Sequence, residues 1–217
     1  TREWQAVGKG TGGRAGRCDA ESGRFRERLA EWGVADDTIG FFTSDNGPHR
    51  EGGHDAEFFE SRGQLRGIKR DLYEGGIRVP MIVRWPGVVP EGAASDTPWA
   101  FWDVLPTAAD IAGVSPPDAI DGASVLPTLR GADQTPHEYL YWEFYERGFD
   151  QAVLTHPWKG VRRTRGGGQL ELYNLDDDIG ETTDIVADHP DIAARITEIM
   201  AEAHADNEHY QLPTTGG

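Results

Sequence analysis

The stretch that decides the fold reads Thr38-Ile39-Gly40-Phe41-Phe42-Thr43-Ser44-Asp45-Asn46-Gly47. Its first six residues are β-branched, aromatic or small, which predicts a short buried strand over 38–43. Polar residues follow at once, so the strand ends in a polar tip. In α/β sheets, ligands bind beyond the carboxyl ends of the strands. Residues 44–47 are therefore the first candidates for a site.

The segments on either side of this strand alternate between helical and extended patterns. Before the strand, three apolar residues recur at helical spacing: Phe25, Leu29 and Trp32. They predict a helix over 21–32. After the strand we expect a second buried strand over 79–85 and a helix over 103–111. This alternation predicts an α/β domain over 21–136, whereas the Gly/Arg-rich residues 1–20 are expected to form a disordered tail.

The pattern changes after residue 136. Four extended segments follow one another with short turns between them: 139–145, 151–155, 158–163 and 170–175. Consecutive strands without intervening helices predict an antiparallel sheet. Pro190 suits the first position of a last helix, whose apolar stripe should pack on that sheet. We therefore expect a small α+β subdomain over 137–207 and a tail over 208–217.

The composition narrows the function classes. The net charge of −16 argues against a nucleic acid partner, because phosphate backbones are bound by clustered cations. No apolar run approaches the roughly 18 residues that cross a bilayer, so no membrane partner is expected. Cys18 is the only cysteine, which excludes an internal disulfide and a multi-cysteine metal site. The chain starts without Met and without a signal-peptide pattern, and we expect a fragment or a processed product.

Asp45 and Asn46 are candidate metal ligands. A carboxylate and an amide carbonyl are hard oxygen donors that suit Ca²⁺ or Mg²⁺, and Gly47 lets the backbone turn tightly beside them. Asp-Asn-Gly is also a common turn sequence, and the residues alone do not choose between the two interpretations. The acidic run at 176–178 resembles part of a calcium loop, but its glycine is misplaced, so we expect a solvated turn there.

Lys69 is the candidate for binding an anion. It stands in a glycine-flanked loop, where its ammonium could hold an anionic ester oxygen. His49 and His54 lie in the same loop and could line a pocket or donate protons. Judged singly, each of these three could also be a solvated surface residue. Arg78 is expected to form a structural salt bridge with a nearby carboxylate.

Five motifs follow one another along the chain: Thr43-Ser44-Asp45-Asn46-Gly47-Pro48-His49, Gly63-Gln64-Leu65-Arg66-Gly67-Ile68-Lys69, Tyr73-Glu74-Gly75-Gly76-Ile77-Arg78-Val79-Pro80, Asp103-Val104-Leu105-Pro106-Thr107 and Asp121-Gly122-Ala123-Ser124-Val125-Leu126-Pro127-Thr128-Leu129. Together they resemble the arylsulfatase family, within the alkaline-phosphatase-like superfamily. Segments 158–159 and 171–175 are similar to the family's C-terminal subdomain. The resemblance implies an α/β fold: the C-terminal part of an alkaline-phosphatase-like domain, then a small antiparallel sheet and a C-terminal helix.

The resemblance also implies roles for the candidate residues. Asp45 and Asn46 match the family's second pair of calcium ligands, and Lys69 matches the lysine that contacts the sulfate group. His49 and His54 fall where related enzymes shape the substrate pocket. The family hydrolyses sulfate esters with a formylglycine nucleophile and Ca²⁺, so the implied partner is a sulfated small molecule or glycan. Localisation stays open, although the family includes periplasmic and secreted enzymes.

The sequence departs from the family at the nucleophile. The family nucleophile lies in a Cys-x-Pro/Ala-x-Arg signature, whereas Cys18 has Ser22 in place of the arginine, so Cys18 is not expected to be the nucleophile. The first aspartate pair of the calcium site has no match either. We therefore expect the C-terminal fragment of a sulfatase, which needs further Ca²⁺ ligands and is inactive alone. Two alternatives stay open: a non-catalytic binding module with a sulfatase-like fold, and a phosphoester or phosphonate hydrolase of the same superfamily.

Overall fold

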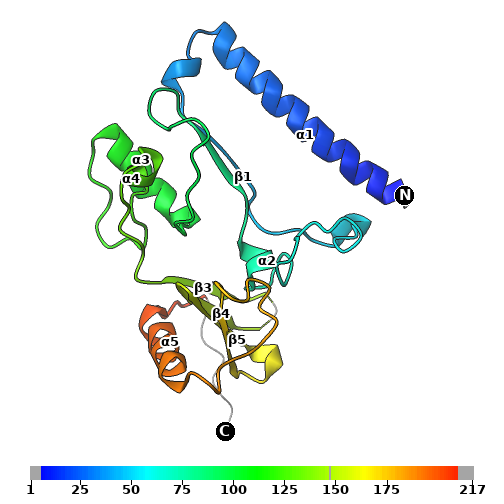
Figure 1. Cartoon of the computed structure of the whole chain (residues 1–217), viewed down its shortest axis with the longest axis vertical. Helices are drawn as coiled ribbons and strands as arrows, with labels where there is room; N and C mark the ends of the chain where they lie inside the picture. Colours follow the sequence, from blue (N-terminus) through cyan, green and yellow to red (C-terminus); the bar gives the residue numbers. More distant parts are fainter. Residues whose placement is uncertain (1–5, 147, 210–217) are drawn as a thin grey trace. The chain divides into compact units, whose positions relative to one another are not determined.

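The computed structural model describes residues 6–146 and 148–209, with the elements arranged along the chain as in Figure 1. Contacts divide the chain into two units. The first contains the residues up to 44, then 49–61 and 80–136, and the second contains 45–48, 62–79 and the residues from 137 onward. A boundary at 136 was expected, but the grouping of 45–48 and 62–79 with the C-terminal sheet was not. No helix in the described ranges is long and apolar enough to span a bilayer.

Helix α1 (Ala6–Glu31) begins well before the predicted start at residue 21. The prediction of a disordered tail is therefore wrong for residues 6–20, which are helical. Once a helix has formed, each added residue contributes a backbone hydrogen bond, and glycine disfavours the helix by only about 1 kcal/mol. Phe25 and Trp32 are 63% and 66% exposed, so the predicted apolar stripe does not face a core.

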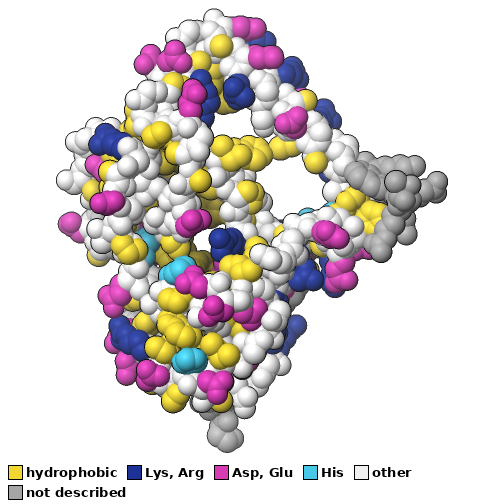
Figure 2. Space-filling model, viewed as in Figure 1, with side chains coloured by type: hydrophobic (Ala, Val, Ile, Leu, Met, Phe, Trp, Pro, Cys, Tyr) yellow, Lys and Arg dark blue, Asp and Glu magenta, His cyan; other side chains and the backbone are white. Residues whose placement is uncertain are grey.

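Strands β1 (Gly40–Thr43) and β2 (Met81–Arg84) pair antiparallel in a two-stranded sheet, with Phe42 opposite Ile82. Both strands exist where predicted, but the prediction that they are buried is wrong, because Phe42 and Ile82 are 48% and 62% exposed. A two-stranded sheet has two open edges and cannot cover its own faces. Hydrophobic side chains at the surface are visible in yellow in Figure 2.

Helix α3 (Val104–Ala112) confirms the predicted helix, and one-turn helix α4 (Leu126–Leu129) follows it in the first unit. Asp103 is fully buried, and its Oδ1 accepts a 2.8 Å hydrogen bond from the backbone N–H of Ala123. Thr107 Oγ1 accepts another, at 3.0 Å, from the N–H of Val125. Buried polar groups need such partners. Two of the five motifs, those at 103–107 and 121–129, are therefore tied together in one structure.

The second unit contains the predicted antiparallel sheet, in the order β3-β4-β5-β6. Its strands are β3 (Leu140–Phe144), β4 (Asp150–Thr155), β5 (Trp158–Arg163) and β6 (Leu170–Asn174). Helix α5 (Pro190–Ala203) begins at the predicted proline and lies against this sheet in Figure 1. The fold expected for the C-terminal part of the chain is thus confirmed.

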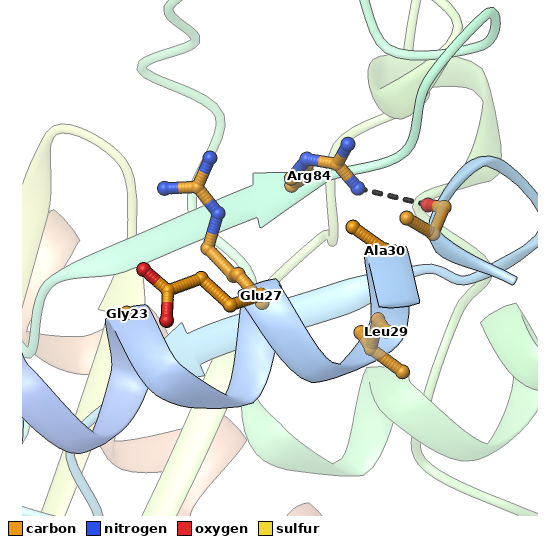
Figure 3. Close-up of a pocket in the computed structure, with 7 residues that line it drawn as sticks. Gly23, Glu27, Leu29, Ala30 and Arg84 are labelled. Atoms are coloured by element: carbon orange, nitrogen blue, oxygen red, sulfur yellow. Dashed lines mark hydrogen bonds between the residues drawn. The ribbon is translucent and has the colours of Figure 1, made fainter. Parts of the chain in front are cut away.

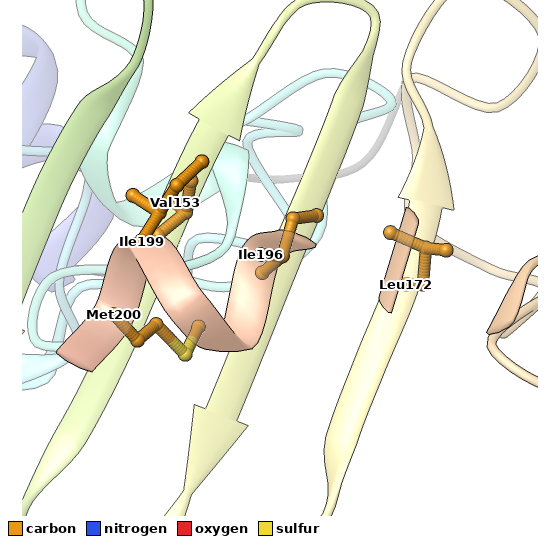
Figure 4. Close-up of a cluster of buried hydrophobic side chains, with 5 residues drawn as sticks. All are labelled: Val153, Leu172, Ile196, Ile199 and Met200. Atoms are coloured by element: carbon orange, nitrogen blue, oxygen red, sulfur yellow. The ribbon is translucent and has the colours of Figure 1, made fainter. Parts of the chain in front are cut away.

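The core of this unit lies between α5 and the sheet. Its most buried side chains, each at most 2% exposed and drawn in Figure 4, are Val153, Leu172, Ile196, Ile199 and Met200. The period of 3.6 residues places the α5 members on one face of the helix. Strand β5 meets α5 closely, since a Cβ on Gly160 would lie 2.5 Å from Cγ2 of Ile196. This packing gives the second unit a rigid scaffold.

Candidate functional site

Asp45 and Asn46 lie just beyond β1, which ends at Thr43, at the polar tip predicted for them. Asp45 is exposed and Asn46 is half-buried. Nδ2 of Asn46 donates a 3.0 Å hydrogen bond to the backbone oxygen of Gly47, which turns the amide oxygen away from that carbonyl. The two oxygen donors fit a hard cation, but Ca²⁺ takes about six to eight oxygens. No cluster of three or more His, Cys, Asp or Glu suited to a metal occurs in the described ranges.

Two backbone hydrogen bonds join this loop to Lys69 and to one-turn helix α2 (Glu74–Ile77). The N–H of Lys69 donates to the oxygen of Pro48 at 2.8 Å, and the N–H of Gly47 donates to the oxygen of Gly76 at 2.9 Å. The structure therefore brings Lys69 close to the backbone of the loop that carries Asp45 and Asn46. The side chain of Lys69 is half-buried.

Close backbone contact explains the glycines of these loops. A Cβ on Gly47 would lie 1.9 Å from the backbone oxygen of Gly75. A Cβ on Gly75 would lie 2.5 Å from the oxygen of Arg66, and one on Gly76 would lie 2.0 Å from the oxygen of Asp71. No side chain fits at such distances, so three backbone segments touch only because glycine stands at each position. The loop of Asp45 and Asn46 thus has one fixed place against α2.

His49 and His54 belong to the first unit, whereas Lys69 belongs to the second. Nδ1 of His49 accepts a 2.9 Å hydrogen bond from the backbone N–H of Glu51. Nε2 of His54 lies 3.0 Å from Oγ of Ser61. Both contacts are local to the 49–61 loop, and the His54 ring also stacks on Phe59 with 5.3 Å between the ring centres. Their role in a substrate pocket stays a prediction.

Three smaller expectations can be compared with the structure. Arg78 makes the predicted structural salt bridge, with Nη1 at 3.4 Å from Oε2 of Glu74. Cys18 is exposed on α1, in the first unit. The 176–178 segment forms the predicted turn, in which Oδ2 of Asp178 accepts the N–H of Thr182 at 2.7 Å. None of the three adds a group to the candidate site.

A buried group of three charges next to α2 was missed by sequence reasoning. Lys159 is fully buried, and its Nζ lies 2.6 Å from Oε1 of Glu74 and 3.7 Å from Oε1 of Glu181. Oε2 of Glu181 accepts the backbone N–H of Glu74 at 2.7 Å. Burial raises the pKa of Glu181 to about 7, although Lys159 acts to lower it. The only sequence signal was a lysine within a predicted strand, and it does not identify partners distant in sequence.

A second polar group surrounds Glu171. The hydroxyls of Tyr73 and Tyr173 each donate a 2.5 Å hydrogen bond to Oε2 of Glu171, and the Arg66 guanidinium lies 3.9 Å from the centre of the Tyr73 ring. Burial disfavours the charged carboxylate, but these hydrogen bonds and one from a neighbouring arginine outweigh it and lower the pKa of Glu171. Three of these residues, Arg66, Glu171 and Tyr173, line a polar hollow of about 390 Å³.

A groove in the first unit, shown in Figure 3, contains none of the predicted site residues. Helix α1 forms most of its lining, and Arg84 of β2 donates a 2.9 Å hydrogen bond to the oxygen of Ala35 at its edge. The lining combines apolar residues with the charged side chains of Arg26, Glu27 and Arg84.

Two family models match this chain. Residues 68–207, more than half of the chain, match the family described as N-sulphoglucosamine sulphohydrolase, C-terminal. Residues 13–114 match the family described as Sulfatase. The second match begins inside the segment 1–20 that was expected to lie outside the resemblance. Both fold units are covered by the two matches.

Individual relatives agree with these models. Steryl-sulfatase of Mus musculus is 40% identical over 139 residues, which cover 62% of this chain and 22% of the relative. The N-acetylglucosamine-6-O-sulfatase of Bacteroides thetaiotaomicron is 33% identical over 173 residues, which cover 78% of this chain and 28% of that enzyme. This chain therefore spans about a quarter of the length of these relatives.

A solved structure shares the fold. The crystal structure of Ps i-CgsB in complex with k-i-k-neocarrahexaose has a TM-score of 0.75 and 27% sequence identity, with 89% of this chain and 42% of that chain covered. The motifs, the fold and the family matches agree with one another. The chain belongs to the sulfatase family, of alkaline-phosphatase-like fold, and corresponds to the family's C-terminal portion.

Proposed function

We propose that this chain forms one wall of the active site of a sulfate-ester hydrolase. In this proposal Asp45 and Asn46 bind a divalent cation, Ca²⁺, and Lys69 contacts the sulfate group. The observation that carries the proposal is the 2.8 Å hydrogen bond from the N–H of Lys69 to the oxygen of Pro48, which joins the two loops. A cation loop and a lysine held in one unit form a binding region for a dianionic or monoanionic ester.

Each side chain has a chemical task in this arrangement. Asp45 and Asn46 present a carboxylate and an amide oxygen, the donor types that hard cations prefer. The bound cation would supply positive charge to the sulfate oxygens. The ammonium of Lys69 would stabilise negative charge on those oxygens as the ester bond breaks, an effect worth more in a site that excludes water. The bond from the Lys69 N–H to the oxygen of Pro48 joins the two loops, and the bond from the Gly47 N–H to the oxygen of Gly76 holds the cation loop against α2.

The substrate in this proposal is a sulfated sugar. One relative is named as an N-acetylglucosamine-6-O-sulfatase, and one structural neighbour was solved in complex with k-i-k-neocarrahexaose. The polar hollow beside Arg66 offers hydrogen-bonding groups of the kind that sugar hydroxyls use. The net charge of −16 further disfavours a nucleic acid as the substrate.

The isolated chain is proposed to be inactive. Asp45 and Asn46 supply two of the roughly six to eight oxygens that Ca²⁺ requires. Cys18, the only cysteine, lies on α1 and lacks the signature arginine. Without an activated nucleophile, the wall can bind an anion but cannot open the ester by covalent catalysis. We expect no turnover of 4-nitrophenyl sulfate or glucosamine 6-sulfate by this chain with added Ca²⁺.

The role of Lys69 is tested in the longest reading frame that contains this chain. Lys69→Ala should lower kcat/KM for the sulfate ester by about 10²–10³, the loss expected when a group that stabilises developing charge is removed. Arg165→Ala removes an exposed cation of the same unit and should leave kcat/KM unchanged. An unchanged kcat/KM in Lys69→Ala would refute the proposed contact. A higher kcat/KM for a phosphonate monoester than for the sulfate ester would refute the substrate class.

A further inference from the structure

The buried charges around Lys159 need a reason beyond stability. Lys159 and Glu181 are fully buried and Glu74 is 4% exposed. The desolvation of three charges in a core offsets much of their attraction, and apolar side chains of similar volume often serve a core as well or better. The Lys159 ammonium also lies 5.7 Å from the centre of the Trp142 ring, which anchors it to the C-terminal sheet.

Two members of the group, Lys159 and Glu181, contact Glu74, and Arg78 at the end of the same helical turn adds a third contact. Its side chain is held by the 2.6 Å hydrogen bond from Nζ of Lys159. Its backbone N–H donates to Oε2 of Glu181 at 2.7 Å, and its backbone oxygen accepts the N–H of Arg78 at 2.7 Å. Glu74 is the first residue of α2. The buried charges therefore determine where this single helical turn begins.

The same turn carries the support for the cation loop. Gly75 and Gly76 follow Glu74 directly, and the oxygen of Gly76 accepts the N–H of Gly47 at 2.9 Å. Gly47 in turn follows Asn46. The two backbone segments are tightly packed here, because a Cβ on Gly47 would lie only 1.9 Å from the oxygen of Gly75. A displacement of Glu74 is thus transmitted through tightly packed backbone to Asn46.

We propose that Lys159 is a positioning residue, which acts from strand β5 through Glu74 and Gly76 to hold the loop that presents Asp45 and Asn46 to the cation. The inference rests on the proposed function, because the cation site is itself proposed there. It gives the C-terminal sheet a part in the site that is separate from burying apolar surface. It also gives these buried ionisable groups a geometric role, since Lys159 holds the Glu74 side chain and Glu181 accepts the Glu74 backbone N–H.

The test follows individual backbone amides of the 217-residue chain by NMR. Lys159→Met removes the 2.6 Å partner of Glu74, leaves Arg78 at 3.4 Å as a cation beside it, and is strongly destabilising by itself. The informative variant is Lys159→Met/Glu74→Gln, which leaves Glu181 as the only ionisable group of the three and allows it to stay protonated in the core. Arg165→Ala is the control for loss of an exposed cation in the same unit.

Two readouts separate positioning from stability. Hydrogen exchange of the Gly47 amide should become about tenfold faster in the double variant, the change expected for loss of one hydrogen bond. Amides of Val153 and Leu172 should keep their protection, because the core around them is intact. Mn²⁺ should broaden the Asn46 and Gly47 signals of the parent chain, and Ca²⁺ should reverse this broadening. In the double variant, the same broadening should require about tenfold more Mn²⁺ than in the parent chain. The control should match the parent chain in all three measurements.

Each outcome decides the inference. Unchanged Gly47 exchange and Mn²⁺ broadening in the double variant would overturn it, and so would a double variant that fails to fold, because the group would then serve stability. Asp45→Ala separates the two proposals. If Asp45→Ala leaves the Mn²⁺ broadening unchanged, the cation site is wrong, while the Gly47 exchange rate still reports whether Lys159 positions the loop.

Discussion

Replacement of Glu181 by glutamine should make the second unit more stable at neutral pH and leave it unchanged in acid. Glu181 is fully buried, and burial raises its pKa from 4.5 to about 7 even though Nζ of Lys159 lies 3.7 Å away. Two carboxylates share one ammonium in this core, so one proton makes the group electrically neutral. The glutamine of the Glu181→Gln variant would supply that neutral state permanently, and its amide oxygen would still accept the N–H of Glu74.

The magnitude follows from proton linkage. The folded protein holds the Glu181 proton up to about pH 7, whereas the unfolded chain releases it near 4.5. The folded state therefore binds more protons between these values, and this group's contribution to the unfolding free energy falls as the pH rises through that window. At about 1.4 kcal/mol per pKa unit, the loss amounts to about 3 kcal/mol. Below pH 4.5 the carboxyl is protonated in both states and contributes no difference.

Urea unfolding of the parent chain and of Glu181→Gln, at pH values from about 4.5 to about 8, checks this reasoning. The difference in unfolding free energy between the two should be close to zero at about pH 4.5 and reach about 3 kcal/mol in favour of the variant at about pH 8. Glu91→Gln, at an exposed glutamate, should show no such trend. A variant that is less stable than the parent at the alkaline end, or a difference that does not change with pH, would refute the argument.

Other expectations concern glycines and exposed apolar residues. Gly47→Ala should lower the free energy of unfolding, measured in urea, by about 1–3 kcal/mol, because its Cβ would lie 1.9 Å from a backbone oxygen. Gly16→Ala, on α1, has no atom within 4 Å of its Cβ and should not destabilise the protein. An equal effect of the two changes would contradict the contact. Gly160→Ala should shift α5 and weaken the near-UV circular dichroism, because its Cβ would lie 2.5 Å from a core isoleucine. Phe42 and Ile82 are paired across the sheet and are 48% and 62% exposed, so replacing both by threonine should reduce the light scattering that aggregation causes, without lowering the Tm. A lowered Tm would show that these side chains are packed in solution.

The C-terminal unit could be predicted from local pattern. Residues 158–163 form a strand with the predicted bounds, and α5 begins at Pro190 as expected. Apolar residues alternate along a half-buried strand and recur every 3.6 residues along a helix that packs on a core. Both patterns can be recognised in the sequence, because one face of each element must be apolar. The same reasoning was wrong for residues 6–20, where helix propagation overrides a glycine-rich composition. It was also wrong about burial of β1, since a strand's burial depends on partners that its own residues do not specify.

The candidate site divides in the same way. Asp45, Asn46 and Lys69 could be singled out from residue type and motif order, because hard oxygen donors and a lone lysine have recognisable chemistry. The hydrogen bond between Lys69 and Pro48 and the burial of Lys159 against Glu74 could not, because they join positions far apart in the chain. Local sequence specifies helices, strands and donor types. Chain packing decides which of these groups come into contact and which charged groups are desolvated. In this protein that packing sets the geometry of the loop that carries Asp45 and Asn46.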